Sequence, residues 1–489
     1  MVKRFLRDSV VYSLSTFISR GISFFLIPIY TRVFSPEDYG IIDIMAIFAS
    51  IIHLTVALEI SQSVARFFAD AGSLTEKKSY ASTALWFTAF SYLLFYIFVL
   101  VFAQPASFLI LGMENANGLF LVGSFSIVCS GLFNFLNNQL RWQLQSLHNM
   151  ISSLIMTIVS IFVTLTIVVG VNQGIIGVFW GQITGALVGS VIAFTFSRKS
   201  FAFIFDWKKW KEMVAFSLPL VPSGIGVFIA MYIDRIAIRH LMTLADVGIY
   251  GVGYRLASVV SLLMVGVQGA LVPLIYQSYK NPNTPRQIAK VFRYFTFLAL
   301  VLFIGMSFFS KEMLILLTTP DYYQAQIVIS FLVASALFAG MYIFAPGLAI
   351  MKKTRVIALL AISSAILNSV LNFLLIPYFG IRGAAFATLI SMVFKFVLYL
   401  RIANRYYQIP YEWKRIFLAT AAVISAFLAT SLFIMSARYD FLVRVVFFLI
   451  SIGVIFIILI DKKEIITVIH LVRSRCEKLI SGKAQRKVI

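Results

Sequence analysis

The chain contains 489 residues, of which 61% are hydrophobic and only 12% are charged, and its mean hydropathy is +0.94. A soluble domain has about 45–50% apolar and about 25% charged residues, so this composition excludes a soluble protein and indicates an integral membrane protein. The formal net charge of +22 is large enough for a nucleic-acid-binding protein. The positions of the charges argue against that class, and no nucleic acid is expected as a partner. The two cysteines, Cys129 and Cys476, are too few and too far apart for a disulfide framework.

Fourteen apolar segments are long enough to cross a bilayer, because about 20 apolar residues span it as a helix. Residues 1–7 are basic, and the apolar run that follows shows no small-residue cleavage site. We therefore expect an uncleaved first span rather than a signal peptide. The predicted fold class is an all-α polytopic membrane protein. The predicted spans are 10–34, 41–65, 80–103, 119–140, 149–171, 174–196, 212–237, 247–274, 291–310, 325–350, 356–377, 381–402, 415–436 and 441–460.

Lysine and arginine are distributed unevenly over the connections between these spans. The N-terminus, the even-numbered connections and the C-terminal tail hold 31 of them, whereas the odd-numbered connections hold 7. By the positive-inside rule, both termini face the cytoplasm. The asymmetry also supports an even number of spans, since one missed span would scramble it. The positive charge therefore reflects topology, together with attraction to anionic membrane lipids.

Two short motifs recur at nearly the same spacing. Residues 35–41 (SPEDYGI) align with residues 243–249 (TLADVGI) at a shift of 208, and residues 174–177 (GIIG) align with residues 380–383 (GIRG) at a shift of 206. The near-equal shifts indicate an internal repeat of six helices. An even number of helices per repeat gives both copies the same orientation, with a substrate site expected at their interface. The predicted divisions are an N-terminal lobe of helices 1–6 (1–200), a C-terminal lobe of helices 7–12 (201–408), and helices 13–14 with a basic tail (409–489).

The second copy begins in an unusual stretch, residues 213–260. Its first apolar run is interrupted by Pro219, Pro222 and Gly224, and its second carries Arg255 near its start. Proline and glycine are tolerated in membrane helices where neighbouring protein or a water-filled cavity covers the freed backbone groups. A cation inside an apolar span costs about 2.5–3.5 kcal/mol on insertion scales, so it marks a candidate functional site.

Motifs for catalysis are missing from the sequence. It contains no G-x-x-x-x-G-K-[ST] phosphate loop and no H-E-x-x-H motif, and its four histidines match no metal-site spacing. No span gathers the carboxylates or histidines that an intramembrane enzyme needs. We therefore expect no catalytic residue, no metal site and no enzymatic activity, and moving a solute is the simplest function.

The basic tail 461–489 carries apolar residues at helical spacing, which predicts an amphipathic helix on the inner membrane surface. A disordered, solvated tail is the alternative.

Several motifs together point to one family. These motifs are FSPEDYG at 34–40, ARFF at 65–68 followed by Lys77 and Lys78, IDR at 233–235 followed by VGIY at 247–250, and YFGIRGAA at 378–385. With them, the sequence resembles the Wzx-like oligosaccharide flippases of the multidrug/oligosaccharidyl-lipid/polysaccharide exporter superfamily over nearly its whole length.

This resemblance implies two six-helix lobes that rock between inward-open and outward-open states around a central cavity. It implies a polyprenyl-diphosphate-linked oligosaccharide as the substrate, for example a repeat unit of an O-antigen or exopolysaccharide. It also implies the cytoplasmic (inner) membrane of a bacterium or archaeon as the location. Membrane lipids are expected partners, with a polysaccharide polymerase and glycosyltransferases as further candidates.

A flippase for such a substrate needs cations that bind the diphosphate, because charges cannot cross hydrocarbon unaided. Arg20, Arg255 and Lys395 lie inside predicted spans. Arg20 is similar in place to the first-helix arginine of related lipid II flippases, and Arg255 occupies a position where the family often carries Lys or Arg. The alternatives are an ion pair of Arg20 with Asp43 or Glu59, and snorkelling or ion pairing of the other two cations.

Other polar residues are candidates for binding the sugar. Asn134 and Asn138 lie near the end of the fourth span, where their amides suit sugar hydroxyls, although contacts between helices are the commoner use of such residues. Arg66 of the ARFF motif is the remaining candidate for substrate binding.

Four acidic or titratable residues and one arginine are candidates for ion coupling and gating. Glu59, His53 and Asp43 are candidates for sodium or proton coupling, with ion pairing or a satisfied interior histidine as the alternative. No other cofactor is expected. Asp234 and Arg235 are adjacent and so do not face each other on a helix. We interpret them as outer-gate or packing residues.

The favoured function is therefore a non-enzymatic flippase for lipid-linked oligosaccharides, acting in cell-surface polysaccharide biosynthesis. The alternative is an ion-coupled multidrug or small-molecule exporter of the same superfamily, although a cationic cavity would repel the cationic drugs that such exporters usually accept. A third hypothesis is a membrane scaffold for polymer-assembly enzymes.

Overall fold

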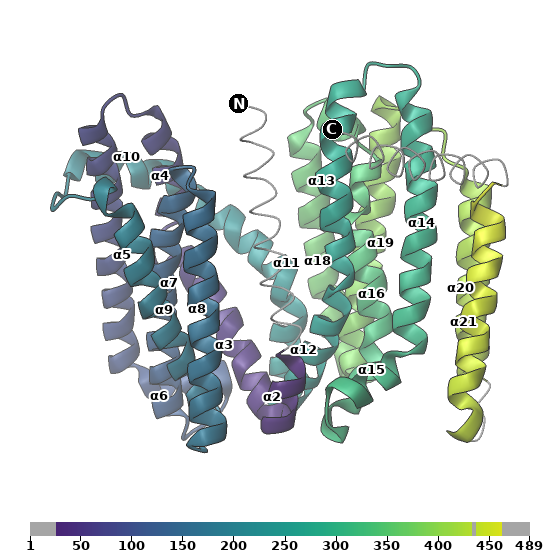
Figure 1. Ribbon diagram of the computed structural model, residues 1–489, viewed down its shortest axis with the longest axis horizontal. Coiled ribbons are helices and arrows are strands. Elements are labelled where there is room, and N and C mark those ends of the chain that lie inside the picture. The colour runs from purple at the N-terminus through teal and green to yellow at the C-terminus, as the bar shows by residue number, and fades with distance from the viewer. Residues whose placement is uncertain (1–25, 433–436, 462–489) are drawn as a thin grey trace, which may run out of the picture. The chain divides into compact units, whose positions relative to one another are not determined.

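The computed structural model describes residues 26–432 and 437–461 (Figure 1). These residues form helices joined by short connections, with no strand among them. Within the described ranges, 13 helical segments are long and apolar enough to cross a membrane. They correspond to the second to fourteenth predicted spans, so the predicted all-α polytopic fold is confirmed. Most of the first predicted span, 10–34, and almost all of the predicted tail helix lie outside the described residues.

The helices follow the apolar runs of the sequence, because a helix satisfies every backbone hydrogen bond internally in lipid. In the first half of the chain they are α2 (Ile27–Val33), α3 (Pro36–Thr55), α4 (Ile60–Asp70), α5 (Leu74–Val101), α6 (Ala103–Leu111), α7 (Asn117–Trp142), α8 (Ser146–Leu165) and α9 (Ile176–Ser197). In the second half they are α10 (Trp207–Ser217), α11 (Leu220–Leu241), α12 (Leu244–Ser258), α13 (Val260–Ser278), α14 (Thr284–Phe308), α15 (Ser310–Leu317), α16 (Gln326–Gly340), α17 (Gly347–Ile350), α18 (Thr354–Phe379), α19 (Ile381–Tyr406), α20 (Trp413–Leu432) and α21 (Ala437–Leu459).

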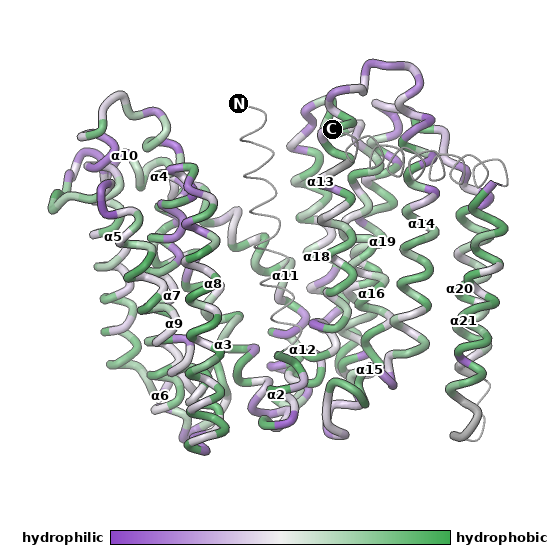
Figure 2. Tube along the Cα trace, viewed as in Figure 1, coloured by the Kyte–Doolittle hydropathy of each residue, from purple (hydrophilic) through white to green (hydrophobic). Residues whose placement is uncertain are grey.

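Figure 2 shows that apolar residues dominate the middles of these helices, whereas hydrophilic residues gather mainly at helix ends and in the connections. Many large apolar side chains remain exposed along α5, α8, α18 and α21. Such a surface would be unfavourable in water but is compatible with lipid. Helices α7, α8 and α9 pack together as one group, seen side by side in Figure 1.

Both copies of the first repeated motif begin a helix in the same way. Ser35 caps α3: its hydroxyl accepts from the Asp38 backbone N–H at 3.2 Å, and the Asp38 carboxylate accepts from the Ser35 backbone N–H at 3.2 Å. Thr243 caps α12 by the same two contacts with Asp246, at 3.2 and 3.1 Å. This reciprocal capping box satisfies backbone N–H groups that a helix start leaves without partners. The repeat predicted from sequence is therefore a repeat of local structure.

The second repeated motif also keeps its backbone conformation in both copies. Gly174 and Gly380 have φ angles of +58° and +57°, in the left-handed region that glycine adopts without steric cost. Gly174 lies two residues before the first residue of α9, and Gly380 lies one residue before the first residue of α19. The repeat therefore extends to the last predicted helix of each lobe.

The second predicted span, 41–65, differs from expectation because it is broken rather than continuous. Helix α3 ends at Thr55 and α4 begins at Ile60. Between them, Leu58 and Glu59 have φ angles of +49° and +52°. Left-handed backbone costs an L-residue about 1–2 kcal/mol, so surrounding contacts must hold this turn in place. The break places Glu59 at the start of a new helix, on the wall of a pocket described below.

The described chain packs as two compact units. The first contains the chain up to Val259 together with Leu314–Val328 and Ala361–Ser391. The second contains Val260–Met313, Ile329–Leu360 and the residues from Met392 onward. The predicted lobes follow the repeat in the sequence, and that division stays a prediction.

Candidate functional site

Helices α3 and α12 of the first unit cross with their backbones in direct contact. Gly40 on α3 lies against the backbone of Leu244 and Gly248, and Gly248 lies against the Pro36 carbonyl. A Cβ atom on either glycine would overlap the opposite backbone. Small residues allow membrane helices to approach this closely. Because Gly40 and Gly248 are counterparts at the shift of 208, the crossing joins equivalent positions of the two motif copies.

Beside this crossing, the Asp43 carboxylate is shared between two arginines. Its Oδ2 atom lies 3.2 Å from Nε of Arg235 on α11, and its Oδ1 atom lies 3.3 Å from Nη2 of Arg255 on α12. Gly251, the repeat counterpart of Asp43, faces the carboxylate, and a Cβ there would lie 3.1 Å from Oδ2. We refer to Asp43, Arg235 and Arg255 as the Asp43 ion cluster.

The two arginines of this cluster differ in access. The Arg235 side chain is 5% exposed and lies over the Tyr254 ring at 4.0 Å. The Arg255 side chain is 29% exposed, and its Nη1 donates to the Tyr39 hydroxyl at 2.6 Å. Neither Oδ2 of Asp43 nor Nε of Arg235 completes a hydrogen bond, so their contact is electrostatic. Arg235 is thus a structural cation, whereas Arg255 is partly accessible.

The adjacent pair Asp234 and Arg235 binds two different partners. Asp234 is buried and accepts a hydrogen bond of 2.6 Å from the Tyr250 hydroxyl on α12, while Arg235 faces Asp43 on α3. The pair therefore connects α11 to both of its neighbours. Its predicted role as an outer gate stays a prediction.

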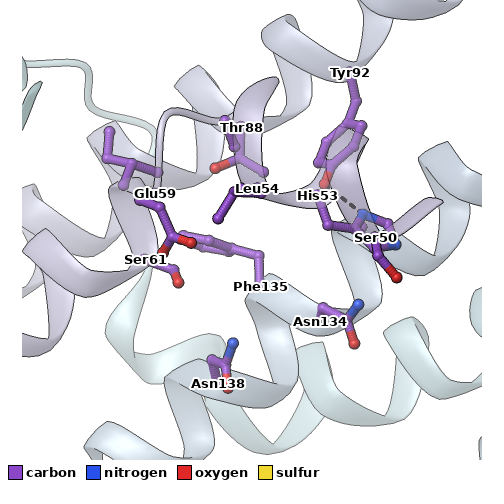
Figure 3. A pocket seen from close by; sticks show the side chains of 13 residues that line it. Ser50, His53, Leu54, Glu59, Ser61, Thr88, Tyr92, Asn134, Phe135 and Asn138 are labelled. Atoms are coloured by element: carbon purple, nitrogen blue, oxygen red, sulfur yellow. Dashed lines mark hydrogen bonds between the residues drawn. The ribbon is translucent and has the colours of Figure 1, made fainter. Parts of the chain in front are cut away.

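A polar pocket with a volume of about 300 Å³ lies between the α3–α4 break, α5 and α7 (Figure 3). Four of the predicted site residues meet on its wall: His53, Glu59, Asn134 and Asn138. Figure 3 shows the Glu59 carboxylate and the two asparagine amides pointing into one space from α4 and α7. The complete lining is Ser50, His53, Leu54, Ala57, Glu59, Ile60, Ser61, Thr88, Tyr92, Gly131, Asn134, Phe135 and Asn138.

His53 is fixed within this wall by both ring nitrogens. Its Nδ1 lies 2.8 Å from the Tyr92 hydroxyl, and its Nε2 lies 3.3 Å from the Ser130 hydroxyl. A neutral ring satisfies both contacts, accepting at one nitrogen and donating at the other. This geometry favours the alternative of a satisfied interior histidine over a coupling role.

Gly131 on α7 keeps Tyr92 in place, because a Cβ at this position would overlap the tyrosine ring. We expect Gly131→Ala to displace Tyr92, break its contact with His53 and destabilise the protein by about 1–3 kcal/mol. Thermal unfolding of the purified protein in detergent measures the effect. Gly118→Ala is the matched control, because Gly118 is on the same helix with no atom near its added Cβ. Equal melting temperatures for the two variants would contradict the expectation.

Of the remaining predicted cations, Arg66 and Lys395 are not among the residues that line this pocket. Arg66 is exposed and pairs with Asp70 at 3.4 Å, one turn along α4. Lys395 lies partly buried within α19 in the second unit, and the described residues provide it with no acidic partner. Arg20 lies outside the described residues.

Arg293, also in the second unit, is a buried cation whose charge is neutralised by acidic side chains. Arg293 is buried and pairs with Glu412 at 3.1 Å and Asp461 at 3.0 Å. Arg415 also binds Asp461, at 2.8 Å, and these two arginines hold the pKa of Asp461 below its usual range. Burying a charge is tolerated when acids neutralise it. Lys395 has no such neutralisation within the described part of the chain.

Sequence reasoning missed Thr88, Tyr92 and Ser50 as pocket residues. Their only signal is a polar side chain within an apolar span, which is common in membrane helices that pack against one another. Tyr39, the partner of Arg255, was quoted only as part of a motif. The facing positions of these residues depend on how the helices pack.

The sequence model of the polysaccharide biosynthesis protein family matches residues 29–327, more than half of the chain. The chain belongs to the polysaccharide biosynthesis protein family. The match includes the Asp43 ion cluster and every residue that lines the polar pocket, so both features lie in the family's own region.

Two curated proteins are similar in sequence to this family member. A protein of Haloferax volcanii named probable low-salt glycan biosynthesis flippase Agl15 is 24% identical over 216 residues, covering 43% of this chain and 46% of the relative. The Lsg locus putative protein 1 of Haemophilus influenzae is 22% identical over 309 residues, covering 60% of this chain and 71% of that relative. The chain thus spans about half the length of the first relative.

Solved structures show the same fold. The lipid II flippase MurJ in an inward-closed conformation aligns with a TM-score of 0.70 at 17% identity, covering 92% of this chain and all of that one. An inward-facing multidrug resistance MATE family transporter aligns with a TM-score of 0.61 at 15% identity, covering 78% of this chain and 93% of the transporter. The chain is therefore a multi-pass membrane protein with the fold of these structures, and the predicted family is confirmed.

Proposed function

We propose that this protein translocates polyprenyl-diphosphate-linked oligosaccharides across the cytoplasmic membrane by alternating access, for cell-surface polysaccharide biosynthesis. The observation that carries the proposal is the polar pocket. It places amides, hydroxyls and one aromatic face on a single wall among membrane-crossing helices of a polysaccharide biosynthesis protein. The name of the Haloferax volcanii relative, a glycan biosynthesis flippase, supports the same reading.

The chemistry of the lining suits a sugar. Each sugar hydroxyl both donates and accepts hydrogen bonds, and the side-chain amides of Asn134 and Asn138 offer both functions. The Phe135 ring supplies an apolar surface for the C–H face of a sugar. A polar head that lost water without such partners would cost several kcal/mol for each unpaired group.

The diphosphate of the substrate requires cations, and three residues are proposed to supply them. Arg255 is partly exposed and shares one acid with Arg235. Lys395 lies inside a membrane-crossing helix, and the described chain offers it no acid. Arg20 is proposed from its place in the sequence. Arginine and lysine both form strong, charge-assisted hydrogen bonds with phosphate.

Topology, driving force and partners complete the proposal. Both termini face the cytoplasm, as the distribution of lysine and arginine favours. Sodium or proton coupling and association with a polysaccharide polymerase or glycosyltransferases are part of the same proposal. Labelling of single cysteines with membrane-impermeant reagents in intact cells tests the topology.

The cation proposal predicts a loss of transport without a loss of fold. We expect Lys395→Ala to slow translocation of a lipid-linked glycan in proteoliposomes by about 10- to 100-fold, because a hydrogen bond to a charged group contributes about 1.5–3 kcal/mol. Lys395→Arg should retain most activity. Lys280→Ala, at an exposed site on the α13–α14 connection, is the control. Unchanged transport by both Lys395→Ala and Arg255→Ala would count against the proposal.

A second candidate function is export of drugs or other small molecules, which the fold shared with the MATE transporter favours. The two functions differ in the expected phenotype of a deletion strain. Loss of surface polymer with unchanged drug susceptibility supports the flippase, and the opposite pattern supports the exporter.

A further inference from the structure

We infer that the polar pocket binds one sugar residue of the substrate and that Glu59 makes it select uncharged or amine-bearing sugars over uronic acids. The inference rests on the proposed function and adds the chemical class of the sugar. It is carried by the balance of charge on the pocket wall, by an unpartnered hydroxyl and by the strained turn that holds Glu59.

The pocket wall carries one acid and lacks lysine and arginine among its described residues. The acid is Glu59, which forms no ion pair within the described part of the chain. His53 uses both ring nitrogens in contacts with Tyr92 and Ser130, so neither nitrogen is left for a ligand. A carboxylate accepts hydrogen bonds from hydroxyl and ammonium groups, and its charge repels a second carboxylate. The wall therefore favours a hydroxyl-bearing or amine-bearing ring over a uronic acid.

Thr88 adds a second polar group to the pocket wall, independently of Glu59. Its side chain is 2% exposed, lines the pocket, and carries a hydroxyl oxygen without a hydrogen-bond partner among the described residues. Buried polar atoms in native proteins are nearly always hydrogen-bonded, so a water molecule or a substrate hydroxyl is expected to complete this one. Figure 3 shows Thr88 on the wall beside Leu54, across the pocket from Asn138.

The size of the pocket limits what it can hold. Its volume of about 300 Å³ lies at the lower end of the range for small-molecule sites and accommodates one sugar ring with its hydroxyls. The pocket is open on one side, so the rest of a glycan can extend out of it. The pocket therefore binds one sugar residue of a glycan, and the other sugar residues bind outside it.

The backbone at Glu59 is conformationally strained. Leu58 and Glu59 are two successive non-glycine residues in left-handed conformation, where α3 breaks and α4 begins. Such strain persists where the surroundings enforce it, and it clusters at binding sites. With this break, Glu59 lies on the pocket wall directly before the first residue of α4. A sodium ion or a proton bound to the Glu59 carboxylate is the alternative to a sugar hydroxyl or amine.

The test uses the purified full-length protein in proteoliposomes and three substrates with identical polyprenyl diphosphates. The single sugar on each is glucose, glucosamine with a free amine, or glucuronic acid, and translocation is measured by access of a membrane-impermeant sugar-modifying enzyme. We expect the glucuronic acid lipid to move at least about tenfold more slowly than the other two. Glu59→Gln should bring the three rates within about threefold of one another. Asp70→Asn, an exposed acid on α4, should leave the discrimination intact.

The outcomes separate this inference from the proposed function. Equal rates for all three lipids with the unmodified protein would overturn the charge selection and leave the flippase function standing. Absence of movement for every lipid would overturn the proposed function itself. If Glu59→Gln stops all three lipids alike while its melting temperature is unchanged, Glu59 serves ion coupling and the inference is wrong. Restored movement of the glucuronic acid lipid in Glu59→Gln supports it.

Discussion

Gly248→Ala is expected to destabilise the protein and to reduce transport, even though alanine is the better helix former. The added Cβ would overlap the Pro36 carbonyl, so α3 and α12 would have to separate. Overpacking of this kind costs about 1–3 kcal/mol and occasionally more, because backbone cannot move aside as a flexible side chain does. Helix propensity alone would instead stabilise the variant by about 1 kcal/mol. Thermal unfolding in detergent and translocation in proteoliposomes measure the two effects.

The matched control is Gly226→Ala on α11, where an added Cβ meets no atom within 4 Å. This control should be neutral or slightly stabilising. Gly40→Ala tests the same crossing from the other motif copy, since its Cβ would overlap the Leu244 carbonyl. We expect it to resemble Gly248→Ala. If both variants unfold at the temperature of the control, the close crossing of α3 and α12 is not needed for stability.

Asp43→Ala is expected to have the second large effect, a loss of about 3–5 kcal/mol of stability. The substitution leaves the Arg235 guanidinium, only 5% exposed, without the acid that faces it. Removing one partner of a buried pair is costly because the remaining charge is desolvated and uncompensated. Denaturation of the purified variant measures the loss. Adding Arg235→Met should recover part of it, because the double variant no longer buries the Arg235 charge.

An exposed ion pair of the same unit provides the comparison for this prediction. Arg66 and Asp70 are both more than half exposed, so Asp70→Ala should cost no more than about 1 kcal/mol. A loss from Asp43→Ala as small as that of Asp70→Ala would mean that water reaches Arg235 and that the Asp43 ion cluster is not a buried one.

Features with local causes could be predicted from the sequence. The membrane-crossing helices follow from runs of apolar residues, since few charged residues interrupt them. The repeat was visible because the capping chemistry of Ser35 with Asp38 and Thr243 with Asp246 depends on residues three positions apart. Grouping of Asn134 with Asn138 was also visible, because residues four apart share one face of a helix.

Features that depend on packing could not be predicted. The break at Leu58 and Glu59 contains neither glycine nor proline, so no local signal marks it. The partner of Arg255 is Asp43, which lies 212 positions away in the sequence. Asp43 was considered as a partner for Arg20 or as a coupling residue, and its place between two other arginines follows only from the crossing of α3 with α12.

The facing positions of Asp43 and Gly251 show that the two halves of this chain have become complementary rather than interchangeable. A hybrid built from two copies of the first half would set carboxylate against carboxylate at the crossing, and one built from two copies of the second half would leave the arginines with no acid. An ancestral duplication that joined identical halves must therefore have diverged at this position. Separately expressed halves should assemble only as an unlike pair.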